Sequence, residues 1–376
     1  MVNPDTIKEL NQAMRSSPAG FLVVDSGSPR FAVLPYEAYQ RLVQTSTHAP
    51  VKKKKLLVTG GAGYIGSQTV RLLQKQQEYE IIILDNLSTG RREAVRDSEL
   101  IVADLSDQAS LEKIFSEFKI DAVIHFAASV EVEESLIDPA KYFQNNVVNG
   151  LNLLDAMVEH GVSKIVFSSS AAVYGQPDAV PISEIATMHP TNPYGESKLI
   201  FEKILKWYGQ SYGIHSVSLR YFNAAGAWPE EALGSNNLLS DTHLITRVLN
   251  VAAGKTPEIE VYGQDYQTPD GTCIRDYVHV LDLADAHIHA LKKLETTNGA
   301  YVYNVGSGIG YSVMEIIDQA MEITGRMIPI KLQGRRAGDP AKLVADSSAI
   351  GRELGWSATH DLRSIMRSAW QWHNMV

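Results

Sequence analysis

The sequence has one cysteine and no long apolar run. Because Cys273 stands alone among 376 residues, an internal disulfide and a zinc site built from several cysteines are excluded. Every apolar stretch is shorter than the roughly 18 residues that a membrane-spanning helix needs, and the N-terminus has no signal pattern. We therefore expect a protein of the reducing cytoplasm that does not enter a membrane.

Positive charge is also scarce. The 34 lysines and arginines are outnumbered by 43 acidic residues, for a formal charge of −9. This balance disfavours nucleic-acid binding through a broad basic surface. The chain is long enough for two domains, and its 44 % hydrophobic content is sufficient for a large buried core.

Glycine, in contrast, is concentrated in one stretch, LLVTGGAGYIG at residues 56–66. Gly61, Gly63 and Gly66 fit the G-x-G-x-x-G spacing, and Gly60, Gly63 and Gly66 fit a wider one. An apolar strand before the turn and helical spacing after it are the setting of a dinucleotide site. There the backbone turns sharply and approaches a pyrophosphate at a helix N-terminus.

A second apolar run, Ile81 to Leu84, ends in Asp85, roughly 20 residues beyond the glycine turn. A carboxylate at this position accepts hydrogen bonds from the ribose hydroxyls of the adenosine half and disfavours a 2′-phosphate. The pattern therefore favours NAD over NADP.

Apolar strands alternate with helical segments from Leu56 onward, which predicts a Rossmann-type, doubly wound parallel sheet of the α/β class. The further strands expected are Ile101–Ala103, Ala122–Phe126, Lys164–Phe167 and Val217–Phe222, and a later helix is expected over Asp282–Leu294. We expect three parts: a prefix module with its linker, an NAD-binding domain and a smaller α/β substrate-binding domain. Their residues are 1–50 for the prefix, 51–223 with 274–309 for the NAD-binding domain, and 224–273 with 310–376 for the substrate-binding domain.

The prefix is predicted to hold two short strands, Phe21–Asp25 and Phe31–Leu34, followed by an amphipathic helix that Pro35 opens. Over about 25 residues it weakly resembles the N-terminal part of Phd/YefM-type antitoxins. That resemblance implies dimerisation and DNA binding, but the prefix has equal numbers of basic and acidic residues, which argues against a DNA role.

Tyr194 and Lys198 are one helical turn apart in the segment NPYGESK, which Pro193 opens. A phenol is a poor base at neutral pH, but a neighbouring ammonium favours the phenolate and makes the tyrosine a usable acid and base. Ser168, Ser169 and Ser170 end a predicted strand at the same sheet edge as the glycine turn, so a hydroxyl is available to a substrate oxygen. The three functional groups together predict proton transfer at a sheet-edge site.

Several motifs carry a resemblance to a known family. They are, in order, TGGAGYIG, DNLSTG, VIHFAA, SSSAAVYG, NPYGESK, RYFNAAGA, DGTCIRDYVHVLDLADAH and YNVGSG. From about Lys55 to Trp372 the chain resembles the UDP-glucose 4-epimerases, which are extended short-chain dehydrogenases/reductases. The resemblance implies reversible inversion at C4 of a UDP-hexose, UDP-galactose to UDP-glucose, through a transient 4-keto sugar with tightly bound NAD.

The resemblance also implies residue roles. Tyr194 is then the catalytic base and acid, Lys198 its electrostatic partner and a ligand of the nicotinamide ribose, and Ser170 a hydrogen-bond donor to the reacting sugar oxygen. The remaining cofactor residues implied are Gly60, Gly63, Tyr64, Ile65 and Gly66 for the pyrophosphate, Asp85 and Asn86 for the ribose, Asp104 and Leu105 for the adenine, and Phe126, Ala127 and Asn145 for the nicotinamide half. The UDP-sugar residues implied are Asn223, His243, Tyr262, Arg275, Arg336 and Asp339, with the two arginines facing the diphosphate.

Two positions concern the sugar itself. Some family members have a lysine near the sugar where this chain has Val130, so that contact is absent or supplied elsewhere. The resemblance places Leu343 beside the sugar C2 substituent, where it would limit access of N-acetylated sugars; a plain core role for this leucine is the alternative. The expected partner is a UDP-sugar, and a homodimer is expected.

Other functions stay open at this stage. Dehydratases of the same superfamily need an Asp-Glu pair where this chain has Ala171 and Ala172, which disfavours elimination. Epimerases acting on UDP-N-acetylglucosamine or on UDP-pentoses and uronates are alternatives, and so is a non-catalytic NAD-sensing protein. The last is disfavoured because Tyr194, Lys198 and Ser170 are all present.

Overall fold

The computed structural model describes residues 21–25, 28–33, 37, 53–235, 242–336 and 339–375. The chain divides into two compact units, Met1–Lys53 and Lys54–Val376. In the first unit β1 (Phe21–Asp25) pairs antiparallel with β2 (Ser28–Val33), so the second strand begins three residues earlier than predicted. The helix predicted from Pro35 lies outside the described residues except for Glu37.

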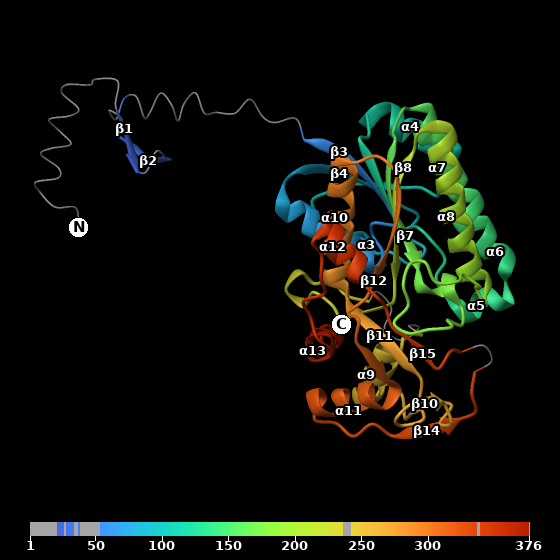
Figure 1. Cartoon of the computed structure of the whole chain (residues 1–376). Helices are drawn as coiled ribbons and strands as arrows, with labels where there is room; N and C mark the ends of the chain where they lie inside the picture. Colours follow the sequence, from blue (N-terminus) through green and yellow to red (C-terminus); the bar gives the residue numbers. More distant parts are fainter. Residues whose placement is uncertain are drawn as a thin grey trace, which may run out of the picture. The chain divides into compact units, whose positions relative to one another are not determined.

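A seven-stranded sheet forms the centre of the second unit, in the order β12-β8-β7-β6-β3-β4-β5 (Figure 1). All of its neighbouring strands are parallel. Their bounds are Lys54–Thr59 (β3), Tyr79–Asp85 (β4), Glu99–Val102 (β5), Ala122–His125 (β6), Lys164–Ser170 (β7), His215–Tyr221 (β8) and Ala300–Val305 (β12). The strands are rich in buried Val, Ile and Leu because both faces of the sheet are covered.

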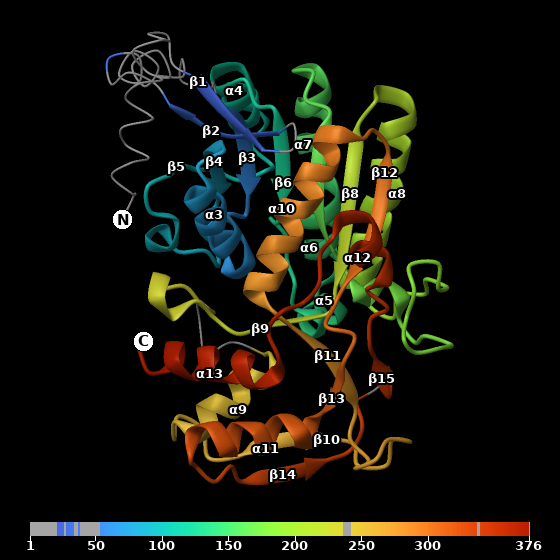
Figure 2. The same ribbon diagram turned by 60° about the vertical axis from the view of Figure 1, so that its left-hand side comes forward.

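Helices cover the two faces (Figures 1 and 2). On one face α3 (Tyr64–Gln76) and α10 (Val280–Thr296) pack on a core that includes Val70, Leu73, Leu283 and Leu291. The helices of the other face are α4 (Gln108–Phe118), α7 (Asn149–Glu159) and α8 (Pro193–Tyr212), and their core includes Leu111, Leu153 and Phe201. The predicted doubly wound Rossmann-type sheet is confirmed.

The order of the strands determines where a ligand binds. Along the sequence, the sheet begins with β3 and continues with β4 and β5 on one side of it. The chain then returns to form β6 on the other side of β3. Sheets of this kind bind ligands outside the carboxyl ends of the strands at such a reversal. The segments that follow β3, β4, β6 and β7 therefore line the candidate site.

A smaller α/β region follows these strand ends, and it lies below them in Figure 2. Its strands are β9 (Asn223–Ala225), β10 (Ile259–Tyr262), β11 (Ile274–His279), β13 (Gly310–Ser312), β14 (Ile330–Gln333) and β15 (Lys342–Leu343). Its helices α9 (Leu244–Ala252), α11 (Val313–Thr324) and α13 (Leu362–His373) pack around a separate core that includes Val248, Ile316 and Met366. The short helices α5 (Val132–Ile137), α6 (Pro139–Phe143) and α12 (Ser348–Leu354) complete the unit.

Two classes of feature are missing from the described part of the chain. None of its helices is both long and apolar enough to cross a bilayer. Within the same residues there is no group of three or more His, Cys, Asp or Glu side chains arranged to hold a metal ion.

Candidate active site

The glycine turn joins β3 to α3 and has the shape of a phosphate cradle. Gly60 adopts φ 71°, a left-handed conformation that favours glycine, and a Cβ at this position would lie 2.5 Å from the backbone nitrogen of Ala127. A Cβ on Gly66 would overlap the carbonyl oxygen of Gly60. Gly63 precedes the first residue of α3, and no side chain caps this helix end. The bare backbone at a helix N-terminus fits the pyrophosphate of a dinucleotide.

Asp85 ends β4 beside this turn and is 7 % exposed. Its Oδ2 accepts a hydrogen bond from the Ala62 backbone N–H at 2.9 Å, and its Oδ1 accepts one from Leu87 N–H at 2.8 Å. The carboxylate thus fixes the glycine turn against the next strand. Each oxygen retains a second lone pair for a ribose hydroxyl.

Asn86 and Asp104 come together from neighbouring strand ends. Asn86 Nδ2 donates to Asp104 Oδ2 at 2.6 Å. Burial alone would raise the pKa of Asp104, but hydrogen bonds from Ser106 and Asn86 lower it, so the carboxylate is ionised at neutral pH. Leu105, the next residue, is buried. The four residues assigned to the adenosine half, Asp85, Asn86, Asp104 and Leu105, therefore lie at the ends of the adjacent strands β4 and β5.

The residues assigned to the nicotinamide half follow β6. The backbone N–H groups of Phe126 and Ala127 both donate to the Thr59 carbonyl oxygen, at 2.9 and 3.1 Å. Asn145 lies in a π-helical turn between α6 and α7, and its side chain donates to Asn146 Oδ1 at 3.0 Å. The first two contacts connect the end of β6 to β3, and the third lies within the π-helical turn.

Asn146 is a site residue that the sequence analysis missed. It is 3 % exposed, and its Nδ2 donates to the Ser129 carbonyl oxygen and to Ser197 Oγ, both at 3.0 Å. The loop after β6 is thereby joined to α8, which carries the tyrosine and the lysine. Only its place beside Asn145 in the sequence could have drawn attention to it.

Tyr194 lies in the first turn of α8. Pro193 is at the first helical position, and the Asn192 side chain caps the helix by accepting from Gly195 N–H at 2.8 Å. Burial raises the pKa of the Tyr194 phenol, the Ser170 side chain works in the opposite direction, and the charge of Glu131 raises it further. The Tyr194 phenol thus lies near the hydroxyl of Ser170, the residue that ends β7.

Lys198 is 2 % exposed and lies one turn further along α8. Its Nζ donates to the Ser168 carbonyl oxygen at 2.8 Å and lies 5.8 Å from the centroid of the Tyr194 ring. Burial lowers the pKa of Lys198 to about 7, although the negative charge of Glu202 opposes the shift. The ammonium is therefore held by the same strand end that carries Ser170.

A buried ion pair lies next to Lys198 and to the serines at the end of β7. The sequence analysis did not identify this pair. Glu202, one more turn along α8, accepts from Arg220 Nε at 2.9 Å and from Nη2 at 2.6 Å, and it also accepts from the Ser169 hydroxyl. The side chains of Arg220 and Glu202 are only 4 % and 7 % exposed. Arg220 Nη1 donates to Tyr174 OH at 2.9 Å. The pair joins α8 to β8 and, through Ser169, to β7. These contacts are adjacent in the sequence to Ser170 on β7 and one helical turn from Lys198 on α8.

The residues assigned to the UDP-sugar fall into groups on the smaller region. Arg275 of β11 forms an ion pair with Asp339, and Leu343 of β15 is the parallel partner of Arg275. The Arg336 guanidinium lies 4.0 Å from the centroid of the Tyr262 ring, and its Nη1 is 3.1 Å from Glu133 Oε1. Two arginines that are each held by a neighbouring carboxylate are suited to bind a diphosphate, and the face of a tyrosine ring is suited to contact a flat base.

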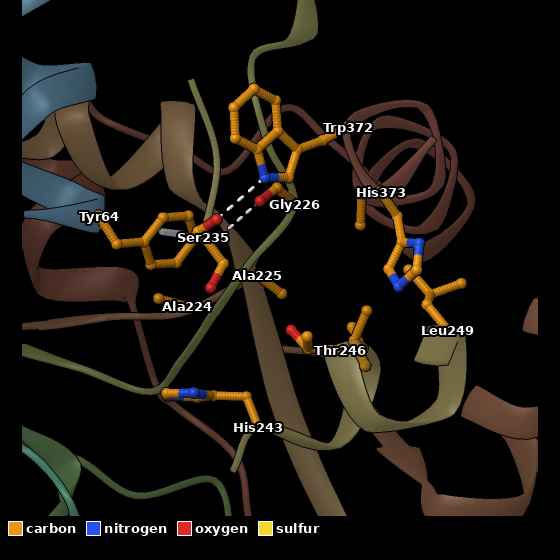
Figure 3. Close-up of a pocket in the computed structure, with 12 residues that line it drawn as sticks. Tyr64, Ala224, Ala225, Gly226, Ser235, His243, Thr246, Leu249, Trp372 and His373 are labelled. Carbon is orange, nitrogen blue, oxygen red and sulfur yellow. Dashed lines mark hydrogen bonds between the residues drawn. The ribbon is translucent and has the colours of Figure 1, made fainter. Parts of the chain in front are cut away.

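Two further residues lie nearer the glycine turn. His243 precedes α9 and lines a pocket together with Tyr64 and Trp372 (Figure 3). Tyr64 OH donates to the Gly226 carbonyl oxygen at 2.5 Å, and Trp372 Nε1 donates to the Ser235 carbonyl oxygen at 3.0 Å. Asn223 begins β9, three residues before Gly226, and pairs with Tyr277 of β11. The structure thus places a predicted cofactor residue, Tyr64, and a predicted substrate residue, His243, on one pocket.

A glycine cradle at the strand reversal and a Tyr-x-x-x-Lys pair, whose lysine donates to the carbonyl oxygen of a strand-end serine, define a dinucleotide-dependent enzyme of the short-chain dehydrogenase type. The model of the NAD dependent epimerase/dehydratase family matches residues 56–306. The chain belongs to this family. It is an enzyme that uses NAD to epimerise a UDP-hexose at C4, which confirms the activity and cofactor that the motifs predicted.

Individual relatives agree with this assignment. The chain is 48 % identical to the UDP-glucose 4-epimerase of Lacticaseibacillus casei, over 85 % of this chain and 96 % of that protein. It matches the crystal structure of UDP-glucose 4-epimerase from Brucella ovis in complex with NAD with a TM-score of 0.82 and 46 % identity, covering 84 % of this chain and 97 % of that one. The UDP-Glc/GlcNAc 4-epimerase of Campylobacter jejuni matches with a TM-score of 0.77 and 40 % identity, covering 86 % and 100 %.

Proposed function

We propose that Tyr194, Lys198 and Ser170 catalyse the interconversion of UDP-galactose and UDP-glucose. The observation that carries this proposal is the position of Lys198, at the sheet edge that also holds the glycine cradle. Its Nζ donates to the Ser168 carbonyl oxygen at 2.8 Å and lies 5.8 Å from the centroid of the Tyr194 ring. A phenol and a strand-end hydroxyl at this edge provide one group to move the proton of the sugar 4-hydroxyl and another to orient that oxygen.

Each residue has a distinct part. Tyr194 takes the proton from the 4-hydroxyl and later returns it, and Ser170 donates a hydrogen bond to the same oxygen. Lys198, whose ammonium is fixed by the Ser168 carbonyl oxygen, supplies positive charge near the Tyr194 ring. It also supplies a hydrogen-bond donor for the nicotinamide ribose. When bound, the nicotinamide ring supplies the hydride acceptor and donor for C4. Gly60, Gly63, Tyr64, Ile65, Gly66, Asp85, Asn86, Asp104, Leu105, Phe126, Ala127 and Asn145 are the residues proposed to hold NAD.

Substrate binding is assigned to the smaller region. Arg275 and Arg336 pair with the diphosphate, and Asn223, His243, Tyr262 and Asp339 complete the contacts. The supporting observation is that neighbouring side chains hold both guanidinium groups in place, Arg275 through Asp339 and Arg336 on the ring of Tyr262. We further propose a cytoplasmic homodimer; large exposed apolar side chains on α8 and α5, such as Trp207 and Ile137, support the pairing of two copies.

The direct test uses the purified protein with UDP-galactose and no added NAD. UDP-glucose should accumulate to an equilibrium mixture, as followed by chromatography, because the cofactor stays bound throughout the cycle. Light scattering on the same sample should give twice the chain mass. Absence of UDP-glucose, with and without added NAD, would contradict the proposed activity.

Leu343 is proposed to limit the size of the sugar C2 substituent. It is partly buried, lies beside Arg275 in the β11–β15 register, and packs against a cluster that contains Val173 and Phe222. Leu343→Tyr should abolish turnover of UDP-N-acetylglucosamine while UDP-glucose turnover remains, and Leu343→Ser should raise the acetylated activity. The expected change in preference is about 10-fold to 100-fold, because a clash in a packed pocket costs about 1–3 kcal/mol.

The ratio of kcat/KM for the two substrates measures this effect. Met314, which is partly buried on α11 within the core of the smaller region, provides a control position, and Met314→Leu should leave the ratio unchanged. If both Leu343 variants keep the wild-type ratio, Leu343 is a core residue only.

A further inference from the structure

Glu131, between β6 and α5, has a main chain that is held firmly in place. Its carbonyl oxygen accepts hydrogen bonds from Tyr142 OH at 2.5 Å and from Ser135 N–H at 3.0 Å. The Glu131 residue precedes the first helical residue of α5, yet its side chain does not cap that helix. The carboxylate is therefore available for another purpose.

Tyr142 connects this residue to the catalytic tyrosine. It is fully buried, and its ring meets the Tyr194 ring edge to face, with centroids 6.5 Å apart and an interplanar angle of 82°. Glu134 Oε2 is 2.8 Å from the same hydroxyl, so the one proton of Tyr142 is shared between the Glu131 carbonyl oxygen and the Glu134 carboxylate. Through this rigid aromatic contact, the position of Glu131 is set relative to Tyr194.

The Glu131 carboxylate contacts the segment that leads to His243, a residue assigned to the UDP-sugar. Its Oε2 accepts a hydrogen bond from Thr242 Oγ1 at 2.6 Å, and Thr242 directly precedes His243. The same carboxylate is close enough to Tyr194 to raise the pKa of the phenol. The negative charge of Glu131 thus lies near Tyr194, which is proposed to move the proton of the sugar 4-hydroxyl, and beside the segment that leads to His243.

Neighbouring acidic groups differ from Glu131 in their surroundings. Glu133 is 65 % exposed and paired with Arg336, so solvent and the guanidinium screen its charge. Glu134 is bound to Lys141 Nζ at 2.6 Å as well as to Tyr142. Within the described part of the chain, the side-chain partner of the Glu131 carboxylate is the Thr242 hydroxyl, which is a neutral group.

We propose that Glu131 determines specificity by rejecting UDP-sugars whose hexose carries a carboxylate. The inference rests on the proposed role of Tyr194 at the sugar 4-hydroxyl, because that contact brings the ring substituents of the sugar near Glu131. Glu131 is partly buried, and two like charges repel strongly where solvent screening is reduced, whereas a neutral hydroxymethyl group can donate to the carboxylate. UDP-galactose and UDP-glucose then bind, and UDP-hexuronates are excluded.

The test compares UDP-galactose with UDP-galacturonic acid. For each protein we would measure KM for UDP-galactose and the inhibition constant of UDP-galacturonic acid against it, which needs no turnover of the acid. In Glu131→Gln, which keeps the size and can still accept from Thr242, the ratio of inhibition constant to KM should fall at least about tenfold. Glu131→Asp keeps the charge and should retain the wild-type ratio within about threefold.

Two further variants make the comparison decisive. Glu117→Gln removes the same charge from the exposed face of α4 and should behave as wild type. Glu131→Ser is a second neutral variant with a side chain favoured at a helix start, for use if Glu131→Gln folds poorly. An unchanged ratio in the neutral variants, or a tenfold fall in Glu131→Asp, overturns the proposal. Failure of the wild type to convert UDP-galactose would instead overturn the proposed activity.

Discussion

Replacing Tyr194 with phenylalanine should lower kcat by at least about 10²-fold, the usual contribution of a general acid and base. The ring fills the same space, so its contact with Tyr142 and the packing of α8 are retained. Only the hydroxyl that interacts with Ser170 is lost. Turnover of UDP-galactose and the content of bound NAD in the purified protein are the measurements.

A companion variant separates the roles of the lysine and the tyrosine. Lys198→Ala should weaken NAD binding and lower kcat, and the remaining kcat should rise with pH more steeply than that of the wild type. The reason is that burial raises the pKa of the Tyr194 phenol, so without the ammonium the phenolate forms only at high pH. Lys203→Ala, on the exposed side of the same helix, is the control. Near-normal turnover in Tyr194→Phe would mean that another residue moves the proton.

Glu202→Gln should lower the free energy of unfolding by about 3–5 kcal/mol, because it leaves the Arg220 charge buried and unpaired. Burial alone would lower the pKa of Arg220, and in the wild type the hydrogen bonds and the charge of Glu202 outweigh burial and raise it. Because an arginine stays protonated in proteins, its guanidinium remains charged when Glu202 is replaced. Denaturant unfolding of the two proteins at the same pH measures the difference.

The matched control is an exposed ion pair. Lys331 Nζ lies 3.3 Å from Glu258 Oε1, with side chains 51 % and 41 % exposed, and Glu258→Gln should cost less than about 1 kcal/mol. The double variant Glu202→Gln/Arg220→Met should recover part of the loss, because it removes the unpaired charge. Equal stability of Glu202→Gln and the wild type would show that Arg220 is adequately solvated or paired without the carboxylate.

Local patterns were enough to predict the parts of the site that one chain segment determines. The glycine turn, Asp85 at the end of its strand and the start of α8 at Pro193 each depend on residues close together in the sequence, and each lies where predicted. Strand alternation likewise predicted the doubly wound sheet. Two features differed: β7 extends through Ser170 because its last residues pair with β8, and the outer strand β12 was not predicted.

Contacts between distant segments could not be predicted in the same way. Glu202 and Arg220 are 18 residues apart on a helix and a strand, and a charged pair in an apolar interior has no periodicity. Glu131 and Thr242 are separated by 111 residues, so their hydrogen bond depends on how the smaller region meets the sheet. Asn146 joins Ser129 to Ser197 for the same reason, since three segments must first be placed.

The outer strand β12 has a consequence for biosynthesis. It pairs with β8 along six residues, from Ala300 opposite Ser216 to Val305 opposite Tyr221, although much of the smaller region is synthesised between them. On the ribosome, β8 therefore remains an open edge with unsatisfied backbone groups until residue 305 has emerged. Such edges recruit other strands. A nascent chain or a fragment that stops before β12 thus carries the catalytic tyrosine and lysine on a sheet that is still prone to aggregation.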